Sequence, residues 1–270
     1  MEHYEKFIYR QSGPNQLSGK KHVHPDEFEL LYVTNGRGRV MIGARLFSLT
    51  PGTLYMINGE DVHSVTPDTG TGYVRTILNL PKEYLNRLLA SAQEPELLPM
   101  LLQRGAVRLD SLAAERVERE FESVYNAKEH KNLLFAGALL ALFSACTASA
   151  SQVSPDFGGI ISSVLSYIDQ NITAKITLDD IEKHAFVSKY HICHKFKRTV
   201  GMTPGEYILK RRLSLAKKLL SGSDSALSEI AMSTGFGSFS YFSSSFKRLE
   251  GITPMEYRRR YRVSPKFEKK

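Results

Sequence analysis

The sequence contains two cysteines, Cys146 and Cys193, and no tryptophan. Two cysteines so far apart cannot build a disulfide framework or a CxxC metal site, so both are expected to be free thiols in a reducing compartment. The N-terminal stretch MEHYEKFIYR carries charge where a secretory signal needs an apolar segment. We therefore expect a cytoplasmic protein.

Long hydrophobic runs are also scarce. One apolar stretch, LLFAGALLALFSAC at residues 133–146, is shorter than the roughly 20 residues that cross a bilayer. It predicts a buried or subunit-interface helix, and we expect no membrane partner. The sequence shows no Ser/His/Asp grouping, P-loop or dinucleotide fingerprint, so we expect a protein that is not an enzyme.

Charge is divided unequally along the chain. Residues 1–155 contain 16 Lys and Arg against 17 Asp and Glu, a net charge of −1, whereas residues 156–270 contain 20 against 11, a net charge of +9; the sum is +8. A basic domain beside a neutral one is typical of nucleic-acid binding, although a basic surface also suits a membrane or an acidic protein.

Short apolar stretches alternate with turn signals between residues 22 and 80. FELLYVT ends at Asn35-Gly36, and TLYMI ends at Asn58-Gly59. This pattern predicts a β-barrel or sandwich. After Pro81 apolar residues recur at helical spacing as far as Cys146, and the small, polar stretch TASASQVSPD that follows has the composition of a linker.

The C-terminal part repeats one phrase. FKRTVGMTPGEY at residues 196–207 returns as FKRLEGITPMEY at residues 246–257, with eight identities in twelve positions. Each TPxE is a capping box with proline at the first helical position. Upstream, each copy has a short helix, a tight turn and a second helix, in which Ile192 and Phe196 or Phe242 and Phe246 are expected to be buried.

Two helix-turn-helix units could simply pack together as helical hairpins, but the basic charge favours DNA binding. If the apolar residues face the core, the outward faces of the second helices would read base edges and contact phosphates. They comprise Lys189, Tyr190, Cys193, His194 and Lys197 in copy one, and Phe239, Ser240, Ser243, Ser244 and Lys247 in copy two.

Between the two units, TPGEYILKRRLSLAKKLLSG predicts one continuous helix. Its apolar residues form one stripe, and its cations are expected around the other faces, which would make it a basic spacer. Such a spacer would hold two reading helices in successive major grooves, about 34 Å apart. These cations are Lys210, Arg211, Arg212, Lys217 and Lys218.

The phrases VSKYHICHKFKRTVGMTPGEY and IAMSTGFGSFSYFSSSFKRLEGITPMEYR resemble the double helix-turn-helix domain of the AraC/XylS family of bacterial transcription regulators. The resemblance implies promoter binding to double-stranded DNA, activation by contact with RNA polymerase, and a small-molecule effector, often a sugar or related metabolite. By motif position it assigns base contacts to Tyr190, Cys193, His194, Ser240, Ser243 and Ser244. His194 and Ser244 stand where many members carry arginine.

The front part, with HVHPDEFELLYVTNG and later His63 in INGEDVH, looks like the two motifs of the cupin barrel, the usual sensor fold in this family. The expected fold class is therefore multi-domain: an N-terminal cupin-like β-barrel with a helical dimerisation segment, and a C-terminal all-α double helix-turn-helix domain. The expected parts are residues 1–80 for the barrel, 81–146 for the helices, 147–156 for the linker, and 157–262 for the DNA-binding domain.

The barrel is expected to hold the effector, and its candidate ligand-binding residues are His24, Glu29, Tyr32, Arg39, Tyr55 and His63. A homodimer is expected through the apolar stripe of Leu133, Leu134, Leu139, Leu140 and Phe143.

No cofactor is expected, but a divalent transition metal is left open. In metal-binding cupins the residues that match His22, His24, Glu29 and His63 ligate such an ion, for which imidazole and carboxylate are suitable donors. The alternative function is therefore a metal-dependent cupin enzyme or metal sensor with an appended DNA-binding module. A non-specific architectural DNA binder would suit the charge but would not need a barrel.

Overall fold

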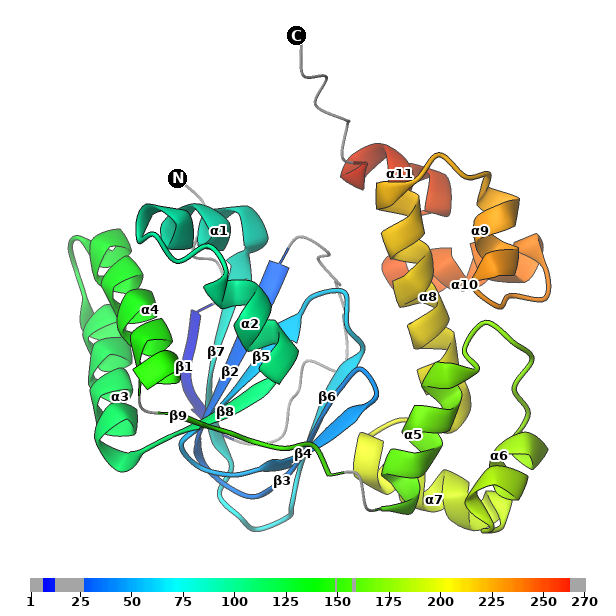
Figure 1. Ribbon diagram of the computed structural model, residues 1–270, viewed down its shortest axis with the longest axis horizontal. Helices are drawn as coiled ribbons and strands as arrows, with labels where there is room; N and C mark the ends of the chain where they lie inside the picture. Colours follow the sequence, from blue (N-terminus) through cyan, green and yellow to red (C-terminus); the bar gives the residue numbers. More distant parts are fainter. Residues whose placement is uncertain (1–6, 13–26, 149, 157–158, 263–270) are drawn as a thin grey trace, which may run out of the picture. The chain divides into compact units, whose positions relative to one another are not determined.

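The computed structural model describes residues 7–12, 27–148, 150–156 and 159–262 (Figure 1). Within these residues the chain divides into a β-rich unit that reaches residue 156 and a helical unit that starts at residue 159. The expected fold class, a β-rich N-terminal domain followed by an all-helical domain, is confirmed.

The β-rich unit is built from two antiparallel sheets. The six-stranded sheet has the order β1 (Phe7–Ser12), β7 (Val74–Pro81), β2 (Glu27–Asn35), β5 (Thr53–Asn58), β8 (Ala106–Leu109) and β9 (Ala150–Gln152). The three-stranded sheet has the order β4 (Arg45–Leu49), β3 (Gly38–Ile42) and β6 (His63–Pro67).

Strand β2 separates two hydrophobic cores. Leu31 and Val33 pack between the two sheets, whereas Leu30 and Tyr32 pack against helices on the other face. Because successive side chains of a strand point to opposite faces, a strand buried on both faces must be apolar throughout. This explains why LLYV, residues 30–33, is a continuous apolar run rather than an alternation.

Four helices contribute to the second of these cores: α1 (Lys82–Ser91), α2 (Leu97–Arg104), α3 (Ser111–Asn126) and α4 (Lys131–Ala148). Helix α3 begins at Asp110, whose carboxylate accepts a hydrogen bond of 2.8 Å from the backbone N–H of Ala113. Apolar residues recur at helical spacing from Ser111 to Cys146, but this segment forms two helices, α3 and α4, which pack against each other.

Helix α4 is the one helix in the described part of the chain that is long and apolar enough to cross a membrane by length and composition. Its residues Ala138, Leu139 and Leu142 are buried in the core beside the six-stranded sheet. Both cysteines are free, as expected. Burial on α4 raises the pKa of the Cys146 thiol to about 12, so this cysteine stays protonated at neutral pH.

Two short strands lie where the sequence predicted other structure. Strand β8 interrupts the segment expected to be helical and pairs with β5. Strand β9, in the stretch expected to be a linker, pairs with β8, and the N–H of Asp156 donates to the carbonyl oxygen of Leu46 at 2.7 Å. Much of the predicted linker is therefore part of the barrel. A strand of four residues shows too little alternation to be recognised between two helices.

The helical unit consists of α5 (Ile160–Gln170), α6 (Leu178–Ala185), α7 (Lys189–Val200), α8 (Pro204–Gly222), α9 (Leu227–Ser233), α10 (Phe239–Glu250) and α11 (Pro254–Tyr261). Figure 1 shows α8 running from the group of α5, α6 and α7 to the group of α9, α10 and α11. Each group contains one helix-turn-helix unit, α6–α7 or α9–α10.

Both repeated TPxE phrases form the predicted capping boxes. The Thr203 hydroxyl accepts from the N–H of Glu206 at 3.3 Å, and the Glu206 carboxylate accepts from the N–H of Thr203 at 2.7 Å. Thr253 and Glu256 make the same two bonds at 3.2 and 2.7 Å. The repeated letters thus begin α8 and α11 by one local mechanism.

Candidate nucleic-acid interface

Helix α7 is held by its apolar face in the first helix-turn-helix unit. The Ser188 hydroxyl accepts a hydrogen bond of 3.4 Å from the N–H of His191 and caps the helix. Ile192 and Phe196 are fully buried, and the Phe196 ring meets the Tyr207 ring edge-on at 5.8 Å between centroids. The predicted inward face is confirmed, so the opposite face of α7 is turned to solvent.

Helix α10 has the same construction in the second unit. The Ser238 hydroxyl accepts from the N–H of Tyr241 at 3.2 Å. Phe242 and Phe246 are fully buried, with ring centroids 5.7 Å apart, and the Phe246 ring lies 5.4 Å from that of Tyr257. The repeat in sequence is therefore a repeat in structure, and both second helices present equivalent faces.

These outward faces contain most of the residues predicted to contact DNA. On each helix, three of them are spaced at i, i+4 and i+7 and form one exposed stripe. The stripes are Tyr190, His194 and Lys197 on α7, and Ser240, Ser244 and Lys247 on α10. Lys189 and Phe239 are also exposed, whereas Cys193 and Ser243 are half-buried at the edge of the stripe. The half-buried positions correspond between copies, because the same helical register is used twice.

The structure also exposes four residues that the sequence analysis did not select: His191, Arg198, Tyr241 and Arg248. The two arginines were visible in the sequence, since each ends the repeated FKR, and each is a cation in the last turn of its helix. At that place an arginine can reach a phosphate.

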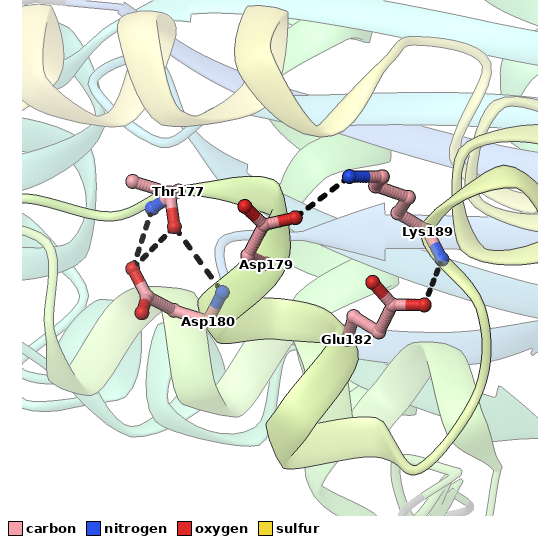
Figure 2. A network of polar contacts seen from close by, with 5 residues as sticks. All are labelled: Thr177, Asp179, Asp180, Glu182 and Lys189. Carbon is pink, nitrogen blue, oxygen red and sulfur yellow. Dashed lines mark hydrogen bonds and ion pairs between the residues drawn. The ribbon is translucent and has the colours of Figure 1, made fainter.

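Lys189 has a partner within its own unit. Figure 2 shows its ammonium group donating to the Asp179 carboxylate at 2.8 Å, while its backbone N–H donates to the Glu182 carboxylate at 3.2 Å. The hydrogen bond and charge of Asp179 raise the pKa of Lys189. Both side chains of the ion pair are exposed, so the pair is weak, and a phosphate would compete with Asp179 for this lysine.

Helix α6 is fixed at its start by the other contacts in Figure 2. The Thr177 hydroxyl accepts from the N–H of Asp180 at 3.2 Å, and the Asp180 carboxylate accepts from the Thr177 N–H at 2.9 Å. Hydrogen bonds from the side chain and backbone of Thr177 lower the pKa of Asp180. This capping box begins α6, while Asp179 and Glu182 join α6 to Lys189 at the start of α7.

The expectation that α8 is a basic spacer is wrong for three of its cations. Lys217 is buried and its ammonium lies 3.1 Å from the Glu250 carboxylate of α10. A buried cation must be paired, because desolvation disfavours its charged form. Accordingly, burial lowers the pKa of Lys217, and the charge of Glu250 opposes that shift.

The other two cations join α8 to the first unit. The Nε of Arg211 donates to the Asp169 carboxylate of α5 at 2.8 Å, and the Nε of Arg212 donates to the carbonyl oxygen of Ile172 at 2.9 Å. Charged groups thus connect the middle of α8 to α5 through Arg211, and its second half to α10 through Lys217.

In the barrel, the structure brings together two of the predicted ligand-binding residues. The Glu29 carboxylate and the Nε2 of His63 lie 3.8 Å apart, and both side chains are partly exposed. Tyr55 is buried, and its hydroxyl donates to the carbonyl oxygen of Ser48 at 2.6 Å. Burial raises the pKa of Tyr55 to about 12.

Two other predicted ligand residues, Tyr32 and Arg39, lie apart from this pair. Tyr32 packs on the helix-covered face of the sheet, where its hydroxyl donates to the Glu118 carboxylate at 3.1 Å, so its assignment to a barrel pocket is wrong. Arg39 is exposed on β3. His24, and His22 from the predicted metal set, lie outside the described residues. The alternating direction of β2 explains the error for Tyr32, since both faces of that strand are buried.

The sequence did not lead us to two buried residues of the β-rich unit, Arg75 and Tyr73. Arg75 on β7 is fully buried, and its guanidinium carbon lies 5.1 Å from the centre of the Tyr73 ring. Arg75 also donates to the Gln11 side chain at 2.9 Å. The signal for Arg75 was a charged residue in the strand VRTILNL, in period two with the apolar Tyr73 and Ile77. Among the described residues no group of three or more His, Cys, Asp or Glu side chains could hold a metal ion.

Two models of protein families match the chain. The AraC-like ligand binding domain matches residues 4–144, and a helix-turn-helix domain matches residues 181–260.

Similar proteins cover either the whole chain or its C-terminal unit. The uncharacterized HTH-type transcriptional regulator YdiP of Escherichia coli (strain K12) is 24% identical over 259 residues, 89% of this chain and 81% of the relative. The HTH-type transcriptional activator AarP of Providencia stuartii is 39% identical over 99 residues, 37% of this chain and 73% of the relative. The solved C-terminal domain of AraT, a response regulator from Geobacillus stearothermophilus, is 25% identical with a TM-score of 0.41, covering 43% of this chain and 96% of that domain.

Proposed function

Because the chain belongs to the AraC family of transcription regulators, we propose that α7 and α10 read the base edges of promoter DNA and that a small effector in the N-terminal barrel controls this binding. The chain has both parts of such a regulator, a ligand-binding domain and a DNA-binding helix-turn-helix domain. The assignment of individual residues to base and phosphate contacts is the part that needs testing.

The observation that supports this proposal is the matching burial pattern of the two second helices. In each, two fully buried side chains fix the helix by one face, which leaves a stripe of polar and basic residues on the other. Polar side chains near the start of a reading helix reach base edges, and lysines farther along contact phosphates. His194 is therefore assigned to base reading, and Lys197 to phosphate binding.

The experiment is a selection of duplexes from a random-sequence pool by the full chain, followed by affinity measurements on the enriched duplex and a scrambled version at physiological salt. The proposal predicts much tighter binding to the enriched duplex. Salt dependence alone cannot test it, because phosphate contacts produce that dependence in specific and non-specific binders alike. Equal affinity for the two duplexes would show a non-specific DNA binder.

We propose that the effector is a sugar or a related metabolite and that Glu29 and His63 contact it. Their separation of 3.8 Å places a carboxylate and an imidazole side by side at a partly exposed position on the barrel. A thermal-shift screen of sugars and related metabolites against the full chain, repeated with His63→Ala, tests this assignment. A compound that stabilises the native chain and the variant equally would exclude His63 from its site.

We propose a homodimer formed through the exposed face of α4. Leu133 is 73% exposed and Leu140 is 37% exposed, and a groove of about 590 Å³ beside Leu140 separates α4 from α1 and α2. Leu139 and Phe143, which the sequence analysis placed in the same stripe, are instead buried in the unit's own core. Sedimentation of Leu133→Glu should show a monomer where the native chain shows a dimer.

We propose further that the chain activates transcription in the cytoplasm by contacting RNA polymerase and that the barrel acts as a sensor rather than as an enzyme. The names of the relatives, which describe transcriptional regulators and activators, support this. We propose an organic effector in place of a resident metal. Elemental analysis of untagged protein tests that choice, and one equivalent of a transition metal that is lost in His63→Ala would favour a metal sensor.

A further inference from the structure

The two helix-turn-helix units differ in the turn that precedes the second helix. In the second unit, Gly235 takes the left-handed conformation, with φ of +87°, and the next residue, Phe236, is buried. In the first unit, Phe186 itself takes the left-handed conformation, with φ of 54° and ψ of 31°, and its side chain is 93% exposed. The second unit thus has the arrangement that favours stability, and the first does not.

Phe186 combines two unfavourable features. A left-handed backbone is strained for a residue with a Cβ atom, and glycine or asparagine is the usual choice there. A ring that is 93% exposed gains almost nothing from packing within the fold. Neither feature helps the chain to fold, so the ring is better explained by something that it contacts outside the chain.

The turn that presents Phe186 is fixed against α7. The Glu182 carboxylate of α6 accepts from the backbone N–H of Lys189, and Asp179 accepts from the Lys189 ammonium group, so two bonds span the turn (Figure 2). The backbone that carries the ring is therefore held at a defined place beside the start of α7. A contact made by the ring then orders only its own side chain and not the turn, which lowers the entropy cost of binding.

We propose that Phe186 is a specificity-determining residue that makes an apolar contact with thymine methyl groups in the major groove. The proposal rests on the proposed function. Phe186 lies two residues before Ser188, the cap of α7, and the first residues of a reading helix lie against base edges. Tyr190, the second residue of α7, is 83% exposed, so the predicted interface has a second exposed aromatic side chain close in sequence to Phe186. Phenylalanine is one of the side chains that pack on the thymine methyl group.

The test compares two versions of the duplex enriched from the random pool by the native chain: one with thymine, and one with deoxyuridine at every thymine, which lacks the methyl group. Phe186→Ala removes the ring and keeps the strained backbone. Leu112→Ala is the control, since Leu112 is 73% exposed on α3 of the other unit. On the thymine duplex Phe186→Ala should lose about fourfold in affinity per methyl group contacted. On the deoxyuridine duplex it should bind as the native chain does.

The outcomes separate this inference from the proposed function. If no duplex is enriched, the proposed function fails. If a duplex is enriched but Phe186→Ala binds both versions like the native chain, or loses equally on both, the thymine contact is wrong. Loss of transcription with unchanged DNA affinity would also overturn it, in favour of a protein partner.

A second variant tests the claim that the ring does not stabilise the fold. Phe186→Asn relieves the left-handed strain and should raise the Tm of the full chain by about 2–4 °C, since asparagine tolerates this conformation. A fall in Tm would mean that the ring packs within the fold, and the inference would then lose its premise.

Discussion

Gly235 and Gly251 offer a matched pair for testing how the two helix-turn-helix units are joined. Both have positive φ, +87° and +79°. A Cβ atom on Gly251 would meet nothing within 4 Å, so Gly251→Ala measures the backbone conformation alone. The left-handed conformation costs an alanine roughly 1–2 kcal/mol. Replacing glycine also lowers the conformational entropy of the unfolded chain, which offsets about 0.4–1 kcal/mol of that cost. The expected net loss in the free energy of unfolding is about 1 kcal/mol.

Gly235→Ala has a further effect, because its Cβ atom would lie 2.7 Å from the carbonyl oxygen of Ile172 and 2.8 Å from the Nε of Arg212. Arg212 donates to that carbonyl oxygen at 2.9 Å and to the carbonyl oxygen of Ala174 at 2.7 Å. Displacing the guanidinium weakens both bonds, and a hydrogen bond to a charged group contributes about 1.5–3 kcal/mol. Because Arg212 is partly exposed, each bond is given the lower value of about 1.5 kcal/mol. Together with about 1 kcal/mol for the backbone conformation, the expected loss in the free energy of unfolding is about 3–4 kcal/mol.

The assay is urea unfolding of the full chain followed by far-UV circular dichroism, because the chain has no tryptophan to report fluorescence. Gly235→Ala and Gly251→Ala are each made in the native chain and, separately, in an Arg212→Ala background. All four variants are compared with the native chain. The difference between the two glycine variants should shrink in the Arg212→Ala background. If Gly235→Ala and Gly251→Ala cost the same in the native background, the turn of the second unit does not depend on Arg212, and the account of α8 is wrong.

Three further predictions concern the helical unit. Lys217→Met should lower the free energy of unfolding by about 3–5 kcal/mol, because Glu250 is left buried and unpaired. In urea unfolding, the double variant Lys217→Met, Glu250→Leu should recover most of that loss. An equal loss in the single and double variants would show that the ion pair is unimportant. Hydrogen bonds from the backbone and hydroxyl of Thr203 hold the pKa of Glu206 below its usual value of 4.5, so its contribution to stability is full above that pH and is lost as the pH falls below it. The stability difference between the native chain and Glu206→Gln should therefore shrink on acidification, and a constant difference from pH 7 to pH 3 would contradict this. Lys197→Ala should weaken binding to every duplex similarly, whereas His194→Ala should change which duplexes are enriched from a random pool; the reverse pattern would exchange their roles.

The sequence predicted the features that depend on neighbouring residues. Thr203 and Glu206 are three positions apart, so their mutual hydrogen bonds follow from helix geometry alone, and the burial of Ile192 and Phe196 follows from helical spacing. These local rules are enough to locate α7 and α10 from the sequence alone.

The features that the sequence did not predict depend on distant partners. The ion pair of Lys217 with Glu250 and the hydrogen bond of Tyr32 with Glu118 join residues far apart in the chain. Nothing in the stretch around Lys217 distinguishes a buried lysine from an exposed one. Similarly, β2 is apolar on both faces, so its sequence could not reveal that Tyr32 faces the helices and Leu31 faces the barrel interior.

The central claim is that α7 and α10, joined by α8, read two successive grooves of one duplex. Helix α8 has 19 residues and is therefore roughly 28 Å long, comparable with the roughly 34 Å between successive major grooves on one face of DNA. The most direct test measures the affinity of the full chain for the enriched duplex before and after half a helical turn of DNA is inserted between its two contacted half-sites. The insertion should reduce the affinity to that for a single half-site, because α8 cannot follow the rotated groove. Unchanged affinity would show that the two units bind independently and would contradict the claim.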